Sequence, residues 1–229
     1  MKQLLIALLI SAAVSSAAID PALMKARDAQ DRPAIDKFVA DAKAAADKSP
    51  KDAEAQYRYA LAVSIQAEVA LEMKDKAGAS RASSNGIPAA QAAIALKPDH
   101  SDYYSVLGTL YGQGIPGNIF SAIGSGKRAQ DAIAKAKQLD PKSAQAWIAE
   151  GVGFYYEPAT FGGGPDPAIR SLKRALELDP KSAEAWLWLG LAQRRKQENA
   201  EARESFTKSL AIDPNRVWAK EQLAKTPAK

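Results

Sequence analysis

The sequence predicts an all-α fold built as a stack of antiparallel helix pairs. The nine residues 139–147, "LDPKSAQAW", return at 178–186 as "LDPKSAEAW", with one residue changed. Prolines that follow an apolar helical pattern recur at Pro50, Pro98, Pro141, Pro180 and Pro214. Between successive prolines lie two segments with apolar residues every three or four positions, the period of an amphipathic helix. Because one helix pair cannot bury its own apolar face, a repeated pair predicts that the copies stack.

Residues 1–18 have the features of an export signal. Lys2 is followed by an apolar run over residues 4–14 and by small residues at 16–18, the order found in a cleaved signal peptide. The run is shorter than the roughly 20 residues that a membrane-spanning helix needs. We therefore expect cleavage, no stable membrane anchor in the mature chain, and a periplasmic or secreted location. An uncleaved N-terminal anchor is the alternative.

The composition narrows the possible partners. The chain has 229 residues, no cysteine and a formal net charge of +5. Without disulfides its stability must come from packing. The positive charges are interspersed with negative ones, and no basic patch suited to phosphates is apparent, so we expect no nucleic-acid partner.

Two short motifs suggest chemistry that the rest of the chain does not support. "GSGK" at 124–127 is similar to part of a phosphate-binding loop, but Ser121 and Arg128 stand where that loop needs Gly and Ser or Thr. His100 is the only histidine, so a multi-histidine metal site or a His-based triad cannot form. We expect no catalytic residue, no cofactor and no metal, and hence no enzyme.

The repeated unit has a fixed arrangement of large and small residues. Counted from Ala183, it contains Trp186, Leu189, Gly190, Ala202, Phe206 and Pro214. Earlier units supply Tyr104, Leu107, Gly108 and Tyr111, then Trp147, Gly151 and Phe154. This pattern resembles the tetratricopeptide repeat (TPR) family over about residues 53–216, with departures at Glu150, Gln193 and Ser209. The resemblance implies about four repeats in a right-handed superhelix, the TPR α-solenoid.

The family positions have a physical meaning in this sequence. Gly151 and Gly190 let two helix backbones approach where a Cβ atom would collide, and Phe206 fills the space beside such a contact. Ser143 and Ser182 precede the first helix of their units and are suited to cap it. The repeated nonapeptide therefore indicates the same joint between neighbouring units.

The spacing of the prolines shrinks along the chain, from 48 residues to 34. The five extra residues of the third unit fall in the turn over 155–167, which contains "TFGGGP", and nine extra residues of the second unit fall between Tyr111 and Ala129. The first unit is expected to lengthen both of its helices. A Gly-rich turn with aromatic residues such as Phe161 is a candidate contact surface, or alternatively a plug over the end of the stack.

The two ends of the chain extend the array. Residues 19–52 predict a degenerate helical pair, with Asp20 as a cap and Pro21 and Pro33 in the first turns. Residues 217–229 predict a C-terminal capping helix and tail, with Trp218 covering the last joint.

The resemblance implies that partners bind the concave face, lined by the first helix of each pair. The candidate partner-binding residues of the groove and loop are Tyr57, Leu61, Ile148, Val152, Tyr155, Tyr156, Phe161, Leu187, Trp188, Leu191 and Arg194. We expect a non-catalytic protein–protein interaction module that acts in the periplasm through an apolar groove. The alternatives are a binding protein for an apolar small molecule, a transport accessory, or a groove filled by the N-terminal helices.

Overall fold

The computed structural model describes residues 19–115 and 122–228. In these residues it contains eleven α-helices and one short 3-10 helix, and no strand. The helices are α1 (Pro21–Asp28), α2 (Arg32–Lys48), α3 (Ala53–Glu72), α4 (Lys76–Leu96), α5 (Ser101–Gly114), α6 (Ala122–Leu139), α7 (Ala144–Tyr156), α8 (Pro165–Leu178), α9 (Ala183–Arg195), α10 (Asn199–Ile212) and α11 (Val217–Ala224). The 3-10 helix, Ala159–Phe161, lies between α7 and α8. The predicted all-α stack of antiparallel pairs is confirmed.

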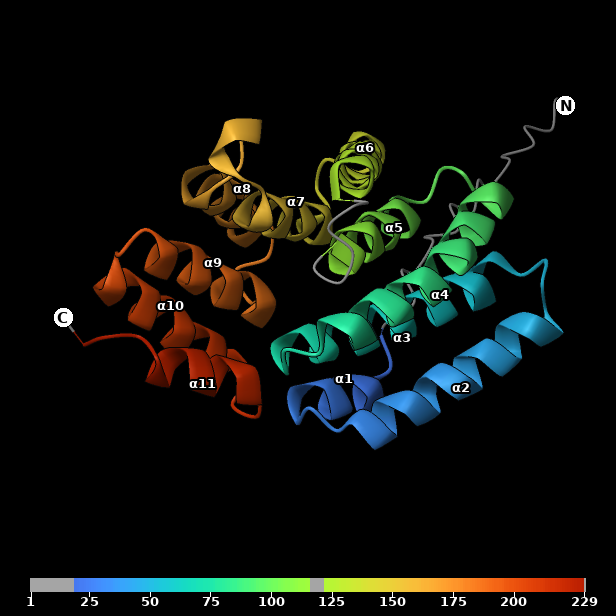
Figure 1. The fold of residues 1–229 in the computed structure, drawn as a ribbon, viewed down its shortest axis with the longest axis horizontal. Coiled ribbons are helices and arrows are strands. Elements are labelled where there is room, and N and C mark those ends of the chain that lie inside the picture. The colour runs from blue at the N-terminus through green and yellow to red at the C-terminus, as the bar shows by residue number, and fades with distance from the viewer. Residues whose placement is uncertain (1–18, 116–121, 229) are drawn as a thin grey trace, which may run out of the picture.

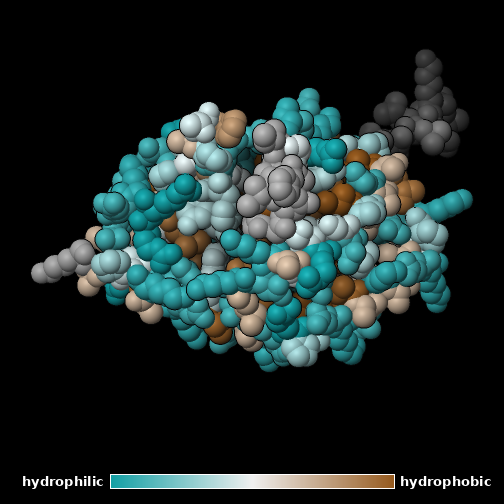
Figure 2. Space-filling model, in the orientation of Figure 1, coloured by the Kyte–Doolittle hydropathy of each residue, from teal (hydrophilic) through white to brown (hydrophobic). Residues whose placement is uncertain are grey.

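The pairs α3/α4, α5/α6, α7/α8 and α9/α10 pack face to face, and each pair packs against its neighbours. Figure 1 shows that the stack curves into an arc, and that the curve brings α11, near the C-terminus, beside α1, near the N-terminus. Figure 2 shows a mostly hydrophilic surface on this face, with hydrophobic residues confined to small separate patches.

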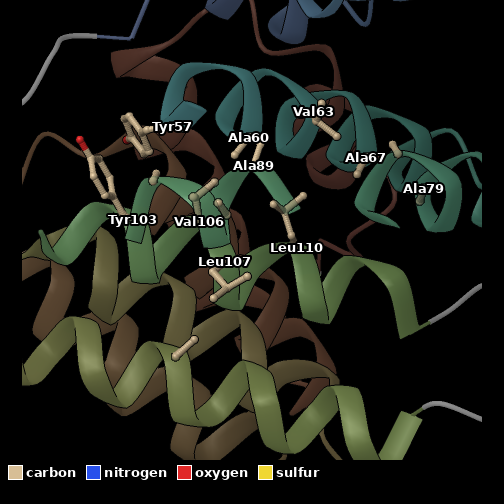
Figure 3. Packing of buried hydrophobic residues seen from close by; sticks show 14 of the residues in the cluster. Tyr57, Ala60, Val63, Ala67, Ala79, Ala89, Tyr103, Val106, Leu107 and Leu110 are labelled. Carbon is tan, nitrogen blue, oxygen red and sulfur yellow. The ribbon is translucent and has the colours of Figure 1, made fainter. Parts of the chain in front are cut away.

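The hydrophobic core is divided along the arc. One cluster of buried residues joins α3, α4, α5 and α6, and many of its members are alanines. Figure 3 shows Ala60 and Ala89 at the contact between α3 and α4, with Leu110 of α5 pointing toward it. A second cluster joins α7 to α11 and is built from larger side chains, among them Leu172, Trp188 and Phe206. The two clusters share no residue.

The repeated nonapeptide forms two equivalent joints. In each, the serine Oγ accepts a hydrogen bond from a backbone N–H three residues on, at 3.2 Å. The aspartate Oδ1 accepts from the backbone N–H two residues on, at 2.9 and 3.0 Å. The indole N–H donates to the proline carbonyl, at 3.1 Å in both. The matching residues are Asp140, Pro141, Ser143 and Trp147 in one joint and Asp179, Pro180, Ser182 and Trp186 in the other.

Glycine is required where the two helices of a unit cross. A Cβ atom on Gly190 would lie 2.7 Å from the Phe206 ring, and one on Gly151 would lie 2.6 Å from Leu172. Real Cβ atoms essentially never come so close to another atom. The packing role predicted for these glycines is confirmed.

The first unit is longer because its helices are longer, as predicted. α3 and α4 have 20 and 21 residues, whereas α9 and α10 have 13 and 14. α4 begins at Lys76 and contains Pro88. It begins there because Asp75 caps it by accepting a hydrogen bond from the Gly78 N–H at 2.7 Å.

The other insertions follow two patterns. In the third unit the extra residues lie between α7 and α8, where the chain makes the 3-10 turn Ala159–Phe161. In the second unit, part of the predicted insertion, residues 116–121, lies outside the described residues. The described part shows α6 with 18 residues, four more than α8, so some of this insertion lengthens a helix.

Both ends of the array are helical. Asp20 accepts a hydrogen bond from the Ala22 N–H at 2.8 Å and so caps α1. At the other end Trp218, which we expected to cover the last joint, packs against Trp188 with 5.4 Å between ring centroids. The predicted division of the chain at residues 18, 52 and 216 stays a prediction.

Candidate functional site

Four aromatic rings from three helices form a continuous cluster, which we call the aromatic cluster. It consists of Tyr155 and Tyr156 at the end of α7, Trp188 of α9 and Trp218 of α11. The centroid of the Trp188 ring lies 5.7, 5.9 and 5.4 Å from those of the other three rings, and the rings meet edge to face. This is a favourable geometry for aromatic pairs.

Tyr156 is the member of the aromatic cluster that a partner can reach. It is 57% exposed, whereas Trp188 is only 7% exposed. The pKa of the Tyr156 hydroxyl is nevertheless raised, first because the surrounding protein desolvates it, and also because Tyr155, Glu72 and Glu68 lie near it. Both glutamates belong to α3, on the far side of the arc. Tyr156 is therefore open to water but faces other parts of the chain, as expected of a residue on a concave face.

Beside the aromatic cluster, long side chains from the two ends of the array meet. Arg216, at the start of α11, is almost fully buried. Its guanidinium group pairs with Glu68 at 2.6 Å and with Glu72, both on α3. It also donates to the backbone carbonyl of Arg27 in α1 at 3.4 Å. The sequence separation reaches 189 residues, so this is a contact between the ends of the stack.

Arg27 extends the same group of charges. Its guanidinium group lies 2.7 Å from Asp28, 3.4 Å from Glu184 of α9, and 4.0 Å from both Glu68 and Asp213. We call these residues the charged cluster. It comprises Arg27, Asp28, Glu68, Glu72, Glu184, Asp213 and Arg216.

The charged cluster contains two arginines and five carboxylates, so full ionisation leaves an excess of negative charge. Burial, followed by the nearby charge of Glu184, raises the pKa of Glu68 to about 8. Burial also raises the pKa values of Glu72 and Asp28. For Arg216 burial acts the other way, but the carboxylates of Glu68 and Glu184 outweigh it and the pKa is raised. The Glu68 carboxyl group therefore keeps a proton near neutral pH.

The charged and aromatic clusters touch at two places. The Trp188 indole N–H donates to Glu184 at 2.6 Å. The Arg216 guanidinium carbon lies 5.7 Å from the centroid of the Trp218 ring, within the range of a cation–π interaction. A substitution in either cluster therefore changes the surroundings of the other.

One stretch of the chain matches a known family model. Residues 162–217, which include α8, α9 and α10, match the model of the tetratricopeptide repeat. This stretch is therefore similar to a tetratricopeptide repeat. No curated protein sequence matches the chain.

Two solved structures share the TPR-type arrangement of helices. One is TTC0263, a thermophilic TPR protein of Thermus thermophilus, with a TM-score of 0.64, 19% identity, and coverage of 88% of this chain and 97% of that chain. The other is the HusA haemophore of Porphyromonas gingivalis, with a TM-score of 0.60, 18% identity, and coverage of 80% and 96%. At these identities the similarity is one of fold.

The structure separates the eleven groove and loop candidates by exposure. Five that we expected on an open surface are buried in the core: Tyr57, Ile148, Leu187, Trp188 and Leu191. Leu61, Val152, Tyr155 and Arg194 are half-buried, and Tyr156 and Phe161 are exposed. For the five buried residues the expectation of an accessible apolar surface is corrected, because neighbouring helices in the stack cover them.

Two candidates have specific positions in the helical stack. Arg194 donates to the side chain of Gln222 at 2.7 Å and to its backbone carbonyl at 3.1 Å, and so holds α11 against α9. Phe161, 68% exposed, lies in the 3-10 turn between α7 and α8. Neither is a member of the aromatic cluster.

Glu150, which replaces a leucine of the TPR pattern, is used in packing. Its carboxylate accepts a hydrogen bond from Ser171 at 2.8 Å and pairs with Lys137. It thus connects α6, α7 and α8.

Sequence reasoning missed the charged cluster, although two signals were available. Glu68 and Glu72 are spaced four residues apart in a helix whose neighbouring positions are apolar. Arg216 stands where the two nonapeptide joints have serine. The sequence alone does not indicate that Arg216 contacts these two glutamates, because residues so far apart meet only when the arc has the observed curvature.

Two further grooves lie between the helices of the stack. One, of about 270 Å³, is lined by Leu107 and Tyr111 of α5 and by residues of α6. The other, of about 450 Å³, is lined by Trp186 and Leu189 of α9 and by residues of α8 and α10. Among the described residues no group of three or more His, Cys, Asp or Glu could hold a metal ion. In the same part of the chain no helix could span a membrane.

Proposed function

We propose that the chain is a non-catalytic TPR scaffold that binds a protein or peptide on its concave face, with Tyr156 as the central contact. TPR modules typically bind proteins or peptides and are generally non-catalytic. The single observation that carries the proposal is the position of Tyr156, an exposed ring that packs against the buried Trp188 and faces α3 across the arc.

The surroundings of Tyr156 favour a partner with an apolar or aromatic side chain. The ring is held at its edge by Tyr155 and Trp188, so its position is fixed before a partner arrives. Preorganised aromatic side chains beside a covered core are typical of the few residues that dominate binding energy. Arg195 lies over the Tyr155 ring at 5.3 Å and donates to the Tyr155 carbonyl, which supplies a polar rim.

A peptide selection experiment tests this proposal without a known partner. A display library of random twelve-residue peptides is panned against the folded chain, and recovered peptides are measured by isothermal titration calorimetry. Tyr156→Ala should weaken binding by about 2 kcal/mol, roughly thirtyfold, as expected of an aromatic anchor. Phe161→Ala is the matched control, because Phe161 is also an exposed aromatic residue but lies in the turn between α7 and α8. Equal effects of the two substitutions, or no recovered peptide, would contradict the proposal.

Native mass spectrometry of the purified chain distinguishes a scaffold for proteins from a binding protein for an apolar small molecule. A scaffold for proteins should give the mass of the polypeptide alone. A reproducible additional mass that is lost on extraction with organic solvent would indicate an apolar small molecule instead.

The proposed location is the periplasm, or the exterior of the cell. It is supported by the pattern of residues 1–18, namely Lys2, an apolar run and small residues. Expression of the full chain in a bacterium and intact-mass analysis of the exported product give the test. Cleavage after Ala18 should leave a chain that begins at Ile19, whereas an unprocessed chain retained in the cell would contradict the proposal.

A further inference from the structure

The ends of this TPR array touch, although a solenoid does not require it. In repeat proteins each unit contacts its neighbours, so the first and last units are normally far apart. Here α1 and α3 meet the start of α11 through Arg27, Glu68, Glu72 and Arg216. Figure 1 shows α1 and α11 side by side.

The contact consists of charged groups. Arg216 is buried between carboxylates of α3, and Arg27 reaches from α1 to Glu184 of α9 and to Asp213. Most packing elsewhere along the stack is apolar. An apolar contact responds little to pH, whereas a contact made of partly protonated carboxyl groups and arginines depends on pH and is sensitive to salt.

We propose that the charged cluster is a clasp that holds the two ends of the array together and, by opening, widens access to the concave face. This inference rests on the proposed function for its biological use, since it regulates the same face. The clasp itself consists of the contacts of Arg216 with Glu68 and Glu72, and of Arg27 with Glu184.

The rest of the fold allows the clasp to open. The two main hydrophobic clusters, one in α3–α6 and one in α7–α11, share no residue. The chain connects the two clusters at the joint between α6 and α7, across the arc from α1 and α11 (Figure 1). At this joint α7 packs on α5 and α6, so a change of angle there would open the clasp without dividing either of the two main clusters.

The direction of the pH effect follows from Glu68. Its pKa is about 8 in the closed clasp, compared with an ordinary value of 4.5. Because the closed state holds this proton more tightly, closure is favoured at low pH and loses that advantage as the pH rises from about 4.5 to 8. The groups facing it are Arg27 of α1, Glu72 of α3, Tyr156 of α7, Glu184 of α9 and Arg216 before α11. The raised pKa values of Glu72 and of Asp28, next to Arg27, act in the same direction.

A distance measurement between the two ends tests the clasp directly. The chain has no cysteine, so Lys25→Cys in α1 and Lys220→Cys in α11, both exposed positions, give two unique spin-label sites. Pulsed electron spin resonance should show one short distance at pH 6. At pH 9 a longer distance should appear, with its population raised at least about tenfold.

Two matched substitutions give opposite expectations. Arg216→Gln removes the charge that joins α11 to α3, so the longer distance should dominate at both pH values. Glu68→Gln keeps an acceptor for Arg216 but removes one negative charge, so the short distance should persist at pH 9. Unchanged distances in the labelled chain between pH 6 and pH 9 overturn the proposal, even if Arg216→Gln fails to fold.

Access to the concave face is measured separately, with acrylamide as the probe. Quenching of tryptophan fluorescence should be stronger in Arg216→Gln than in Glu68→Gln at pH 9, because Trp188 and Trp218 adjoin the charged cluster. Equal quenching in two variants that differ in distance would overturn the gating of this face. If peptide panning fails, the proposed function fails, while the distance and quenching data still decide the clasp.

Discussion

The joint between α8 and α9 and the joint between α10 and α11 have the same backbone turn but different side chains. In the first, Asp179 accepts from the Lys181 N–H at 3.0 Å, and in the second Asp213 accepts from the Asn215 N–H at 3.1 Å. Ser182 then caps α9, whereas Arg216 stands at the equivalent place and makes no cap hydrogen bond. The last joint therefore lacks a side-chain cap, and its arginine instead contacts the other end of the array.

The tryptophans of the two joints also differ, since one contacts its own turn and the other contacts a different helix. Trp186 donates to the proline that begins its own joint, so it stabilises the turn. Trp218 stands two residues earlier in its joint, at the position equivalent to Glu184, and packs against Trp188 in the aromatic cluster. The same backbone turn therefore supports packing between neighbouring units in one joint and contact across the arc in the other. The difference lies in two side chains, Arg216 and Trp218, which replace Ser182 and Glu184.

The largest effect should come from the core beneath the regular joint. Phe206 is fully buried against Gly190, so Phe206→Ala should lower the free energy of unfolding by about 3–5 kcal/mol. Phe161→Ala removes an equal side chain that is 68% exposed and should change it by less than about 0.5 kcal/mol. Urea unfolding followed by circular dichroism measures both. A small loss for Phe206→Ala would mean that the regular units do not depend on this contact.

The next largest effect on stability should come from replacing a glycine at a helix crossing, compared with a glycine in open space. A methyl group on Gly190 meets the Phe206 ring at 2.7 Å, so Gly190→Ala should destabilise the fold by about 1–3 kcal/mol through overpacking. A Cβ on Gly153 meets nothing within 4 Å, so Gly153→Ala in α7 should stabilise the fold by about 0.5–1 kcal/mol. Thermal unfolding of the two variants gives the comparison. Shifts of the same sign would refute the close approach of α9 and α10.

A third substitution tests whether the serine of the regular joint acts only locally. Ser182→Ala removes the oxygen that accepts from the Ala185 N–H at 3.2 Å, and should cost about 1 kcal/mol. The distance between labels at positions 25 and 220 should stay unchanged, in contrast to Arg216→Gln. Ser182→Asn retains a capping side chain and serves as the control. A changed distance in Ser182→Ala would show that the two joints are not separable in function.

Much of the fold was predictable because its determinants are local. Prolines, serine caps and small residues at helix crossings are all read within one unit, and Gly190 and Ser182 behave as the pattern indicates. The candidate site was less predictable. Trp188 and Leu187 are apolar residues on the first helix of a pair, and the sequence does not show that neighbouring helices cover them. The pairing of Arg216 with Glu72 depends on the curvature of the whole stack, which sums small rotations between units.

The smallest effect tests whether the two nonapeptide joints are equivalent. Trp147→Phe and Trp186→Phe each remove one indole hydrogen bond to a proline carbonyl, at 3.1 Å in both joints. A lysine also lies over each ring, Lys137 at 4.0 Å and Lys208 at 4.5 Å. Each substitution should therefore lower the free energy of unfolding by about 0.5–1.5 kcal/mol. Urea unfolding of both variants checks this, and a loss confined to one of them would show that nearly identical sequences stabilise their joints by different means.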